Sequence, residues 1–321
     1  MICEAELSED QPVDFSIIIP VYDNEGSLKP TFERLEDAVF SANKGKSYEV
    51  IFVDDGSGDN SLSELLEIQQ KNPQTVTVIK FTRNFGQGYA RLAGYTHARG
   101  KCLIYLTADL QNPPELINQM LDCFFNQGYD VVIGTRKSRN ESFYRRFTSK
   151  IFYTIIKRLS FPGMPVGGFD YHLISDNVKA LILENREANP FFQGQLLWSG
   201  YRAKMIPYER EKRFIGKSRW TFSKKIKFMI DGISAYSYFP FRIMTAGGIV
   251  VVLAGFVYGI WTFLARIVAH TPMEGWQLLI ILVLVLAGVQ MLMLGIVGEY
   301  LWRTLDQVRN RPPYVIEKIY K

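Results

Sequence analysis

The feature that most constrains the fold is an alternation of short apolar segments with amphipathic segments across residues 15–242, clearest up to residue 134. The apolar segments are rich in β-branched residues and predict buried strands at Phe15–Pro20, Glu49–Val53, Val76–Phe81, Cys102–Leu106 and Val131–Gly134. The intervening segments have helical periodicity and predict helices at Leu28–Ala42, Ser61–Gln70, Gln87–Ala98 and Pro114–Gln127. This order is typical of an α/β fold with a doubly wound, mostly parallel sheet.

Length and composition exclude several classes of protein. The 321 residues suffice for one large or two modest domains, and a mean hydropathy of −0.01 with 47% hydrophobic residues excludes intrinsic disorder. Three cysteines, without metal-type spacing, exclude a disulfide scaffold, and three scattered histidines argue against a zinc site. Acidic residues occupy the start of the chain, where a signal peptide would need to be basic.

Two long runs near the C-terminus contain no charged residue. They are Ile243–Ala265 and Gly275–Gly298, and each exceeds the roughly 20 residues that span a hydrocarbon core. They predict a two-helix transmembrane hairpin, with two buried core helices as the alternative. Basic residues crowd the outer flank of each run, so the positive-inside rule places the N-terminal region and the C-terminal tail in the cytoplasm. The expected location is therefore the cytoplasmic (inner) membrane, with a multi-pass topology.

Basic residues are also concentrated in residues 136–158 and 202–227. In the first segment, apolar residues recur at helical spacing among the charges, which predicts an amphipathic helix at an anionic membrane surface. An ordinary solvated helix is the alternative. The nearby hairpin favours lipid headgroups as the partner, and no nucleic acid is expected.

Acidic residues follow two of the predicted strands. Asp54 and Asp55 follow the second strand, and Asp109, with Gln111 two residues later, follows the fourth. Carboxyl ends of parallel strands share one edge of a sheet, where ligands bind. Carboxylates there suit a divalent cation that carries a diphosphate, because Mg²⁺ takes oxygen ligands from carboxylates and phosphates. Simple turn chemistry is the alternative, since Asp-Gly-Ser favours turns by itself.

Several motifs, in order along nearly the whole chain, resemble glycosyltransferase family 2, and most closely its polyprenyl-phosphate glycosyltransferases. The resemblance rests on residues 19–25 (IPVYDNE), 53–57 (VDDGS), 83–87 (RNFGQ), 108–114 (ADLQNPP), 168–173 (GFDYHL), 213–218 (RFIGKS), 298–301 (GEYL) and 309–312 (RNRP).

The resemblance implies a GT-A-like fold and an inverting transfer of a sugar from a nucleotide sugar to polyprenyl (undecaprenyl) phosphate. UDP-glucose is the first expected donor, followed by other UDP-sugars. Mg²⁺ or Mn²⁺ is the implied cofactor, held by Asp109. The family commonly has Asp-x-Asp at this motif, and Thr107 replaces the first Asp here, which puts metal dependence in question. A homo-oligomer, with a tetramer as one candidate, is also implied.

The resemblance also assigns site residues. Asp109 and Asp170 are the expected catalytic residues. Arg213 and Lys217 are expected to bind the acceptor phosphate. The expected donor-binding residues are Pro20, Tyr22, Glu25, Asp54, Asp55, Arg83, Gln87 and Gln111.

The predicted organisation has four parts. Residues 1–135 form the nucleotide-sugar-binding part of the catalytic domain, and residues 136–242 form its acceptor side with membrane-surface helices. Residues 243–300 form the hairpin and residues 301–321 a cytoplasmic tail. Two other functions stay open: a processive polysaccharide synthase, and a non-catalytic sugar-nucleotide-binding membrane scaffold. The synthase class carries Gln-x-x-Arg-Trp, and here Gly216 occupies the Gln position before Arg219 and Trp220.

Overall fold

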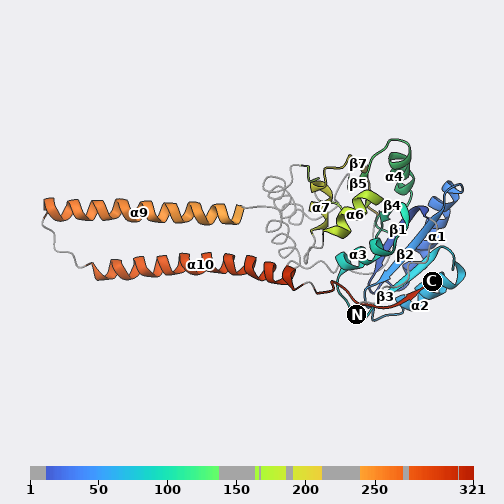
Figure 1. Cartoon of the computed structure of the whole chain (residues 1–321), viewed down its shortest axis with the longest axis horizontal. Helices are drawn as coiled ribbons and strands as arrows, with labels where there is room; N and C mark the ends of the chain where they lie inside the picture. Colours follow the sequence, from blue (N-terminus) through green and yellow to red (C-terminus); the bar gives the residue numbers. More distant parts are fainter. Residues whose placement is uncertain are drawn as a thin grey trace. The chain divides into compact units, whose positions relative to one another are not determined.

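The computed structural model describes seven ranges of the chain: residues 12–136, 163–165, 168–185, 191–211, 239–269, 275–309 and 311–321. The chain divides into two compact units. The first comprises residues 1–228 together with 312–321, and the second comprises residues 229–311 (Figure 1). The predicted amphipathic helix within residues 136–158 lies, apart from Arg136, outside the described residues.

The first unit is built on an eight-stranded sheet in the order β7-β5-β6-β4-β1-β2-β3-β8. The strands are β1 (Val13–Val21), β2 (Tyr48–Asp54), β3 (Val76–Phe81), β4 (Gly100–Tyr105), β5 (Val131–Arg136), β6 (His172–Ser175), β7 (Ala203–Tyr208) and β8 (Ile316–Tyr320). Strands β6 and β8 run antiparallel to their neighbours, so the other six all point in one direction. The sheet is therefore mixed, and the predicted mostly parallel arrangement holds for these six strands.

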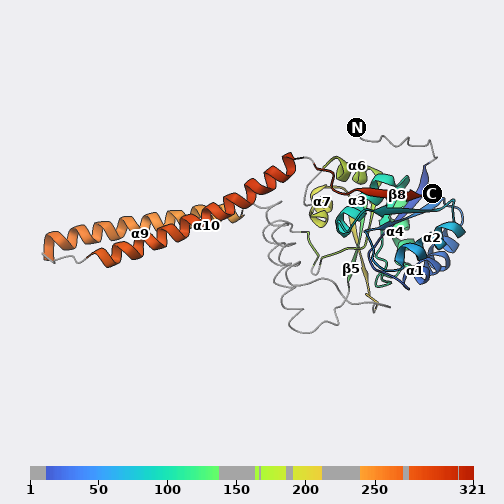
Figure 2. The same ribbon diagram turned by 90° about the horizontal axis from the view of Figure 1, so that it is seen from below.

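Helices cover both faces of this sheet, as a doubly wound fold requires. They are α1 (Leu28–Leu35), α2 (Ser61–Lys71), α3 (Gln87–His97), α4 (Leu116–Phe125), α6 (Asp176–Glu184) and α7 (Phe192–Trp198). The predicted first helix is longer than α1 because a π-helical turn, Glu36–Phe40, and a 3₁₀ turn, Ser41–Asn43, continue it. Figure 2 shows α1 and α2 on one side of the sheet and α3 and α6 on the other.

The central strand β1 supplies both layers of the core. Its residues Phe15, Ile17 and Ile19 belong to the apolar cluster that includes residues of α1, α2 and α4. The intervening Ile18 is equally buried and contacts α3. The contact is close because α3 has a glycine there: a Cβ on Gly94 would lie 2.4 Å from Cγ2 of Ile18. Burial on both faces explains why this strand is an almost continuous apolar run.

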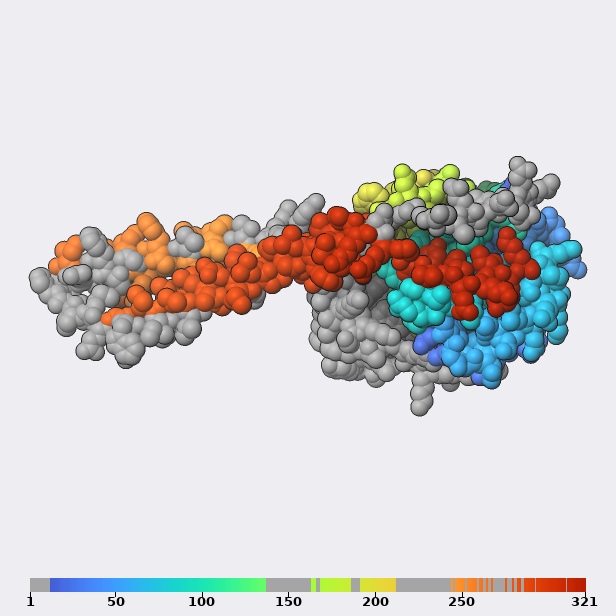
Figure 3. All heavy atoms as spheres, turned by 60° about the horizontal axis from the view of Figure 1, so that its bottom comes forward, coloured from blue at the N-terminus to red at the C-terminus, as the bar shows by residue number. Residues whose placement is uncertain are grey.

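The C-terminal segment adds a strand to the outer edge of the sheet. Strand β8 pairs antiparallel with β3, and the backbone N–H of Thr82 donates to the carbonyl of Val315 at 3.1 Å. The ring of Tyr314 stacks on Phe81 with centroids 5.1 Å apart. Figure 3 shows the C-terminal segment, in red, lying beside residues coloured cyan and light blue. The last residues of the chain therefore form part of the eight-stranded sheet.

The second unit contains two long helices, α9 (Phe239–Ala269) and α10 (Trp276–Val308), which include the two uncharged runs. Within the residues that the structure describes, no helix has the length and apolarity needed to cross a membrane. This finding contradicts the predicted transmembrane hairpin and the predicted multi-pass location in the cytoplasmic membrane. A run without charges is typical of a membrane span, but the lack of charge alone does not establish one.

Candidate functional site

The candidate site lies at the carboxyl edge of the six strands that share one direction. Four of these strands end near polar residues at this edge: β2 at Asp54, β4 shortly before Asp109, β5 at Arg136 and β7 shortly before Arg210. The antiparallel strand β6 begins here, so Asp170 precedes it at the same edge. Ligands of open α/β sheets bind beyond the carboxyl ends of the strands. The topology thus brings three predicted site carboxylates and two arginines to one side of the sheet.

Asp55 anchors the loop that follows β3. Its carboxylate accepts hydrogen bonds from the backbone N–H of Phe85 at 2.7 Å and from that of Gly86 at 2.9 Å. The side chain is buried, and burial raises the pKa of Asp55 to about 6 despite these two hydrogen bonds. The two hydrogen bonds favour the ionised form of Asp55, whereas burial disfavours it.

Asp54 is buried, and only one of its two carboxylate oxygens has a hydrogen-bond partner. One carboxylate oxygen accepts the N–H of Ser57 at 3.1 Å, and the other, Oδ2, is buried without a hydrogen-bond partner. Burial raises the pKa of this carboxyl group above its ordinary value. An unsatisfied buried carboxylate oxygen is costly, and such groups concentrate at functional sites.

A glycine allows the loops after β2 and β3 to meet. Gly56 has a φ of +69°, and a Cβ there would lie 2.5 Å from the carbonyl carbon of Arg83. The Arg83 guanidinium lies over the ring of Phe85, 4.1 Å from its centroid. Any side chain at position 56 would push the Arg83 loop away from Asp54 and Asp55.

The other predicted donor residues have different surroundings. Tyr22 is partly exposed beyond β1, whereas Pro20 is a buried residue of β1 paired with Val53. Glu25 accepts hydrogen bonds from the side-chain amide of Asn60 at 2.8 Å and from its backbone N–H at 3.3 Å. Gln87 is the first residue of α3 and is exposed. Glu25 thus joins two loops, and Pro20 can shape a site only through its backbone.

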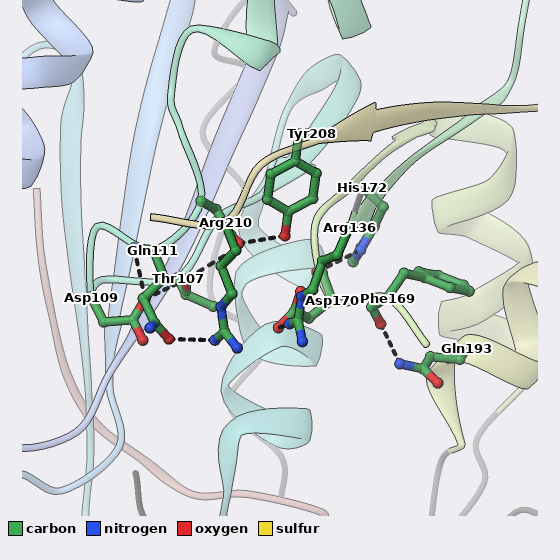
Figure 4. Close-up of polar contacts among 11 residues, drawn as sticks. Thr107, Asp109, Gln111, Arg136, Phe169, Asp170, His172, Gln193, Tyr208 and Arg210 are labelled. Carbon is green, nitrogen blue, oxygen red and sulfur yellow. Dashed lines mark hydrogen bonds and ion pairs between the residues drawn. The ribbon is translucent and has the colours of Figure 1, made fainter. Parts of the chain in front are cut away.

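The turn after β4 presents Asp109 on a network of short side chains. Thr107 donates its hydroxyl to Oδ1 of Asp109 at 2.9 Å and accepts the Asn112 amide at 3.1 Å (Figure 4). Leu110 has a φ of +54°, a left-handed backbone conformation that is uncommon for a non-glycine residue. Strained backbone of this kind is enriched at functional sites. Thr107, at the position of the family's first Asp, thus orients the remaining carboxylate.

The opposite part of the edge is positively charged. Nη2 of Arg136, at the end of β5, lies 2.8 Å from Oδ2 of Asp170, at the start of β6 (Figure 4). Desolvation opposes the charge on Arg136, but Asp170 and Tyr208 outweigh it and raise the pKa of this guanidinium. The pair is incompletely satisfied, because Nε of Arg136 and Oδ1 of Asp170 are buried without hydrogen-bond partners.

A second arginine lies between this pair and the Asp109 turn. Arg210 follows β7 and donates a hydrogen bond from Nη2 to the side-chain carbonyl of Gln111 (Figure 4). Desolvation lowers the pKa of the Arg210 guanidinium, and the nearby charge of Arg136 lowers it further. The guanidinium groups of Arg136 and Arg210 thus lie in one region. The carboxylates of Asp170 and Asp109 partly offset their charge, because both raise the pKa of Arg210. A further negative charge would be stabilised there.

Sequence reasoning did not assign Arg136 or Arg210 to the site. Both were counted among the basic segments and interpreted as membrane-facing charge. The available signal was position: Arg136 comes two residues after the predicted strand Val131–Gly134, and Asp54 comes directly after the predicted strand Glu49–Val53. The predicted acceptor-binding residues Arg213 and Lys217 lie outside the described residues.

The fit of a divalent cation rests on Asp109. Among the described residues, no group of three or more acidic, histidine or cysteine side chains is arranged to hold a metal ion. Mg²⁺ does not require such a group, since it often binds through one or two carboxylates together with substrate phosphates. The donor set of Asp109 and the Thr107 hydroxyl consists of hard oxygens and is compatible with that mode of binding.

Comparison with known proteins identifies the family. The glycosyl transferase family 2 model matches residues 16–181, which cover most of β1, all of β2 to β6 and most of α6. An uncharacterized glycosyltransferase of Synechocystis is 35% identical over 309 residues, covering 96% of each chain. The chain therefore belongs to glycosyl transferase family 2 and is a glycosyltransferase, as its motifs predicted.

Two further relatives carry more specific names. The prophage bactoprenol glucosyl transferase homolog of Escherichia coli is 32% identical over 307 residues, covering 95% of this chain and 99% of the relative. The undecaprenyl-phosphate 4-deoxy-4-formamido-L-arabinose transferase of Klebsiella pneumoniae is also 32% identical, over 309 residues, covering 95% of this chain and 93% of the relative.

Proposed function

We propose that the enzyme transfers one sugar from a UDP-sugar, with UDP-glucose as the first choice, to a polyprenyl phosphate. The observation that carries this proposal is the charge arrangement at one sheet edge. Asp109 provides a carboxylate at the end of β4, and Arg136 and Arg210 provide two guanidinium groups beside it. Such an edge can hold a cation-bound diphosphate next to a second phosphate. The names of the two relatives support a polyprenyl-phosphate acceptor.

The donor would lie against the loops after β1, β2 and β3. Asp54 offers its unpartnered Oδ2 to a hydroxyl or N–H group of the nucleoside, and Asp55 fixes the loop of Arg83. Asp109 would hold Mg²⁺ or Mn²⁺, with Thr107 orienting its carboxylate. The cation would neutralise charge on the diphosphate leaving group.

The acceptor would bring its phosphate to Arg136 and Arg210. An oxygen of that phosphate forms the new bond to the anomeric carbon, while the bond from that carbon to the donor diphosphate breaks and nucleoside diphosphate leaves. A phosphate monoester has a second pKa near 6, so the nucleophile is already mostly dianionic at neutral pH. The arginines offset the repulsion between acceptor and donor phosphates, and Asp170 orients Arg136. Attack opposite the leaving group inverts the anomeric centre.

Transfer is tested with the full chain and radiolabelled UDP-glucose, using undecaprenyl phosphate as acceptor. The expected product is a lipid that carries one hexose through a phosphodiester linkage, formed only with the monophosphate lipid. UDP-galactose, UDP-N-acetylglucosamine and GDP-mannose serve as competing donors. A polymeric product would indicate a processive synthase instead. Absence of labelled lipid with every donor would contradict the proposal.

A further inference from the structure

His172 is a fully buried titratable residue immediately behind the Arg136–Asp170 pair. Its ring stacks on Tyr105 with centroids 5.2 Å apart and contacts Phe192 at 4.6 Å. The guanidinium of Arg91 lies over the same two rings, 4.9 Å from the centroid of Tyr105 and 3.6 Å from that of Phe192. An imidazolium here would be desolvated and would face a second cation. Burial, reinforced by Arg91, accordingly holds the pKa of His172 well below its ordinary range.

Both ring nitrogens of His172 have a hydrogen-bond partner. Nδ1 lies 3.0 Å from the backbone carbonyl of Asp170, and Nε2 lies 2.7 Å from the hydroxyl of Tyr95 on α3. A carbonyl oxygen can only accept, so the proton of the neutral ring must be on Nδ1. Tyr95 then donates its hydroxyl to Nε2. The partners thus fix one tautomer, with Nδ1–H donating to Asp170.

The segment before β6 is held at three consecutive carbonyl groups. The side-chain amide of Gln193 donates to the carbonyl of Phe169, and His172 donates to that of Asp170 (Figure 4). The N–H of Gly134 donates to the carbonyl of Tyr171 at 2.9 Å. The first two donors are side chains, and His172 holds the carbonyl of the residue that pairs with Arg136.

We propose that His172 is a positioning residue: its Nδ1–H fixes the backbone of Asp170 and so aims the Asp170 carboxylate at Arg136. The role in transfer rests on the proposed function, because Arg136 is the group that meets the acceptor phosphate there. Loss of the Nδ1 hydrogen bond would let the Asp170 backbone shift and the Arg136 guanidinium reorient. Acceptor binding would suffer, while the donor loops held by Asp55 would not.

Two amide substitutions of His172 test its Nδ1 and Nε2 hydrogen bonds one at a time. In His172→Asn the amide nitrogen takes the place of Nδ1 and can donate to Asp170, whereas in His172→Gln the amide reaches the place of Nε2 and the Nδ1 donor is lost. Tyr95→Phe is the matched control, because it removes a buried hydrogen bond from the same ring and leaves the Asp170 carbonyl bonded.

We expect His172→Gln to raise the acceptor KM by about tenfold, with the donor KM within about twofold of wild type. His172→Asn and Tyr95→Phe should keep the acceptor KM within about threefold. Equal effects of His172→Gln and Tyr95→Phe would show that the ring acts only by filling the core, and would overturn the proposal.

A measurement without substrate tests the same inference if no transfer is found. In the full chain labelled with ¹⁵N-histidine, the His172 signal, assigned by its loss in His172→Asn, should show a protonated Nδ1 and an unprotonated Nε2 from pH 5.5 to 8. A proton on Nε2, or titration of this ring within that range, would overturn the inference whatever the activity. Failure of transfer with the predicted tautomer intact would instead contradict the proposed function alone.

Discussion

Arg136 and Asp170 join the end of one strand to the start of its antiparallel neighbour through a contact of 2.8 Å between Nη2 and Oδ2. The two residues are 34 positions apart in the chain, and only the reversed direction of β6 brings them to the same edge. The pair leaves Arg136 Nε and Asp170 Oδ1 buried and unpartnered. Under the proposed function, Arg136 Nε would gain a partner when the acceptor phosphate binds.

Replacement of Arg136 by Gln should impair use of the acceptor. The variant loses the cation that faces the acceptor phosphate and leaves Asp170 unpaired, so we expect kcat/KM for polyprenyl phosphate to fall by about 10- to 100-fold, about 1.4–2.7 kcal/mol of transition-state stabilisation. Steady-state kinetics with each substrate varied provide the measurement. Arg202→Gln is the matched control, since Arg202 precedes β7 at the opposite edge, over the ring of Tyr129. A larger effect on donor KM than on acceptor KM would contradict the assignment.

Asp109→Asn should reduce kcat by at least about 100-fold while the protein stays folded. The substitution keeps the shape of the side chain and removes the charge on which a divalent cation depends. Turnover by Asp109→Asn is compared with that of Asp122→Asn, a change at an exposed carboxylate near the end of α4. Near-normal turnover of Asp109→Asn would remove Asp109 from the cation site.

Thr107→Asp should lower the concentration of Mg²⁺ or Mn²⁺ that gives half-maximal activity. The new carboxylate would replace the hydroxyl that donates to Asp109 at 2.9 Å and would supply a second charged ligand. A metal titration of wild type and variant at saturating donor is the test. An unchanged metal requirement would show that position 107 does not face the cation.

Donor use should weaken as the pH falls through about 6, because the Asp55 pKa is raised to about that value. Protonation weakens the hydrogen bonds that the Asp55 carboxyl group accepts from the N–H groups of Phe85 and Gly86, and so loosens the loop that carries Arg83. The pH profile of kcat/KM for the donor provides the measurement, and Asp55→Asn should flatten it in this range.

The raised pKa of Asp55 has the opposite consequence for stability, because it favours the folded state at low pH. The pKa of Asp55 in the folded state lies above its ordinary value of 3.8, so the folded state binds the proton more tightly than the unfolded state. The stabilising contribution of Asp55 to the free energy of unfolding is therefore fully present below about pH 4 and is lost as the pH rises through about 6. Urea unfolding of wild type and Asp55→Asn across this range is the check. A difference between the two that is independent of pH would contradict the raised pKa.

Gly94→Ala should destabilise the first unit by about 1–3 kcal/mol, because the new Cβ would lie 2.4 Å from Cγ2 of Ile18 in the closely packed core. Gly88→Ala is the matched control in the same helix, since nothing lies within 4 Å of its added Cβ. That control should be neutral or stabilising by up to about 1 kcal/mol. Thermal unfolding of the two variants distinguishes close packing from helix propensity, and equal effects would argue against close packing at Gly94.

The sequence was informative where strands are buried on both faces. Strands β1 to β5 were predicted within a few residues because each is a short run of apolar residues. The shorter β6, with His172 and Ser175, was hidden by its polar residues, and β7 by Lys204 and Pro207. Strand β8 has Glu317 and Lys318 at a sheet edge, where an apolar run is not needed.

The contrast between apolar strands and strands with polar residues also explains which residues of the candidate site could be predicted. Asp54, Asp55 and Asp109 could be assigned to the candidate site because they follow recognisable strands. Arg136 and Arg210 were not assigned because basic residues abound in their segments, which concealed the position of Arg136 just after a predicted strand. The pairing of Arg136 with Asp170 depends on the position of β6 between β4 and β5, which is a long-range property of the fold.

The pairing of β3 with β8 has a consequence for biosynthesis. The Lys80–Glu317 ion pair that joins these strands links residues 237 positions apart. During translation, β3 would be the outermost strand, with unpaired amide and carbonyl groups, until the segment that covers it has left the ribosome. An open edge of this kind favours association with other chains. Nascent or prematurely terminated chains should therefore depend on chaperones more than the finished protein does.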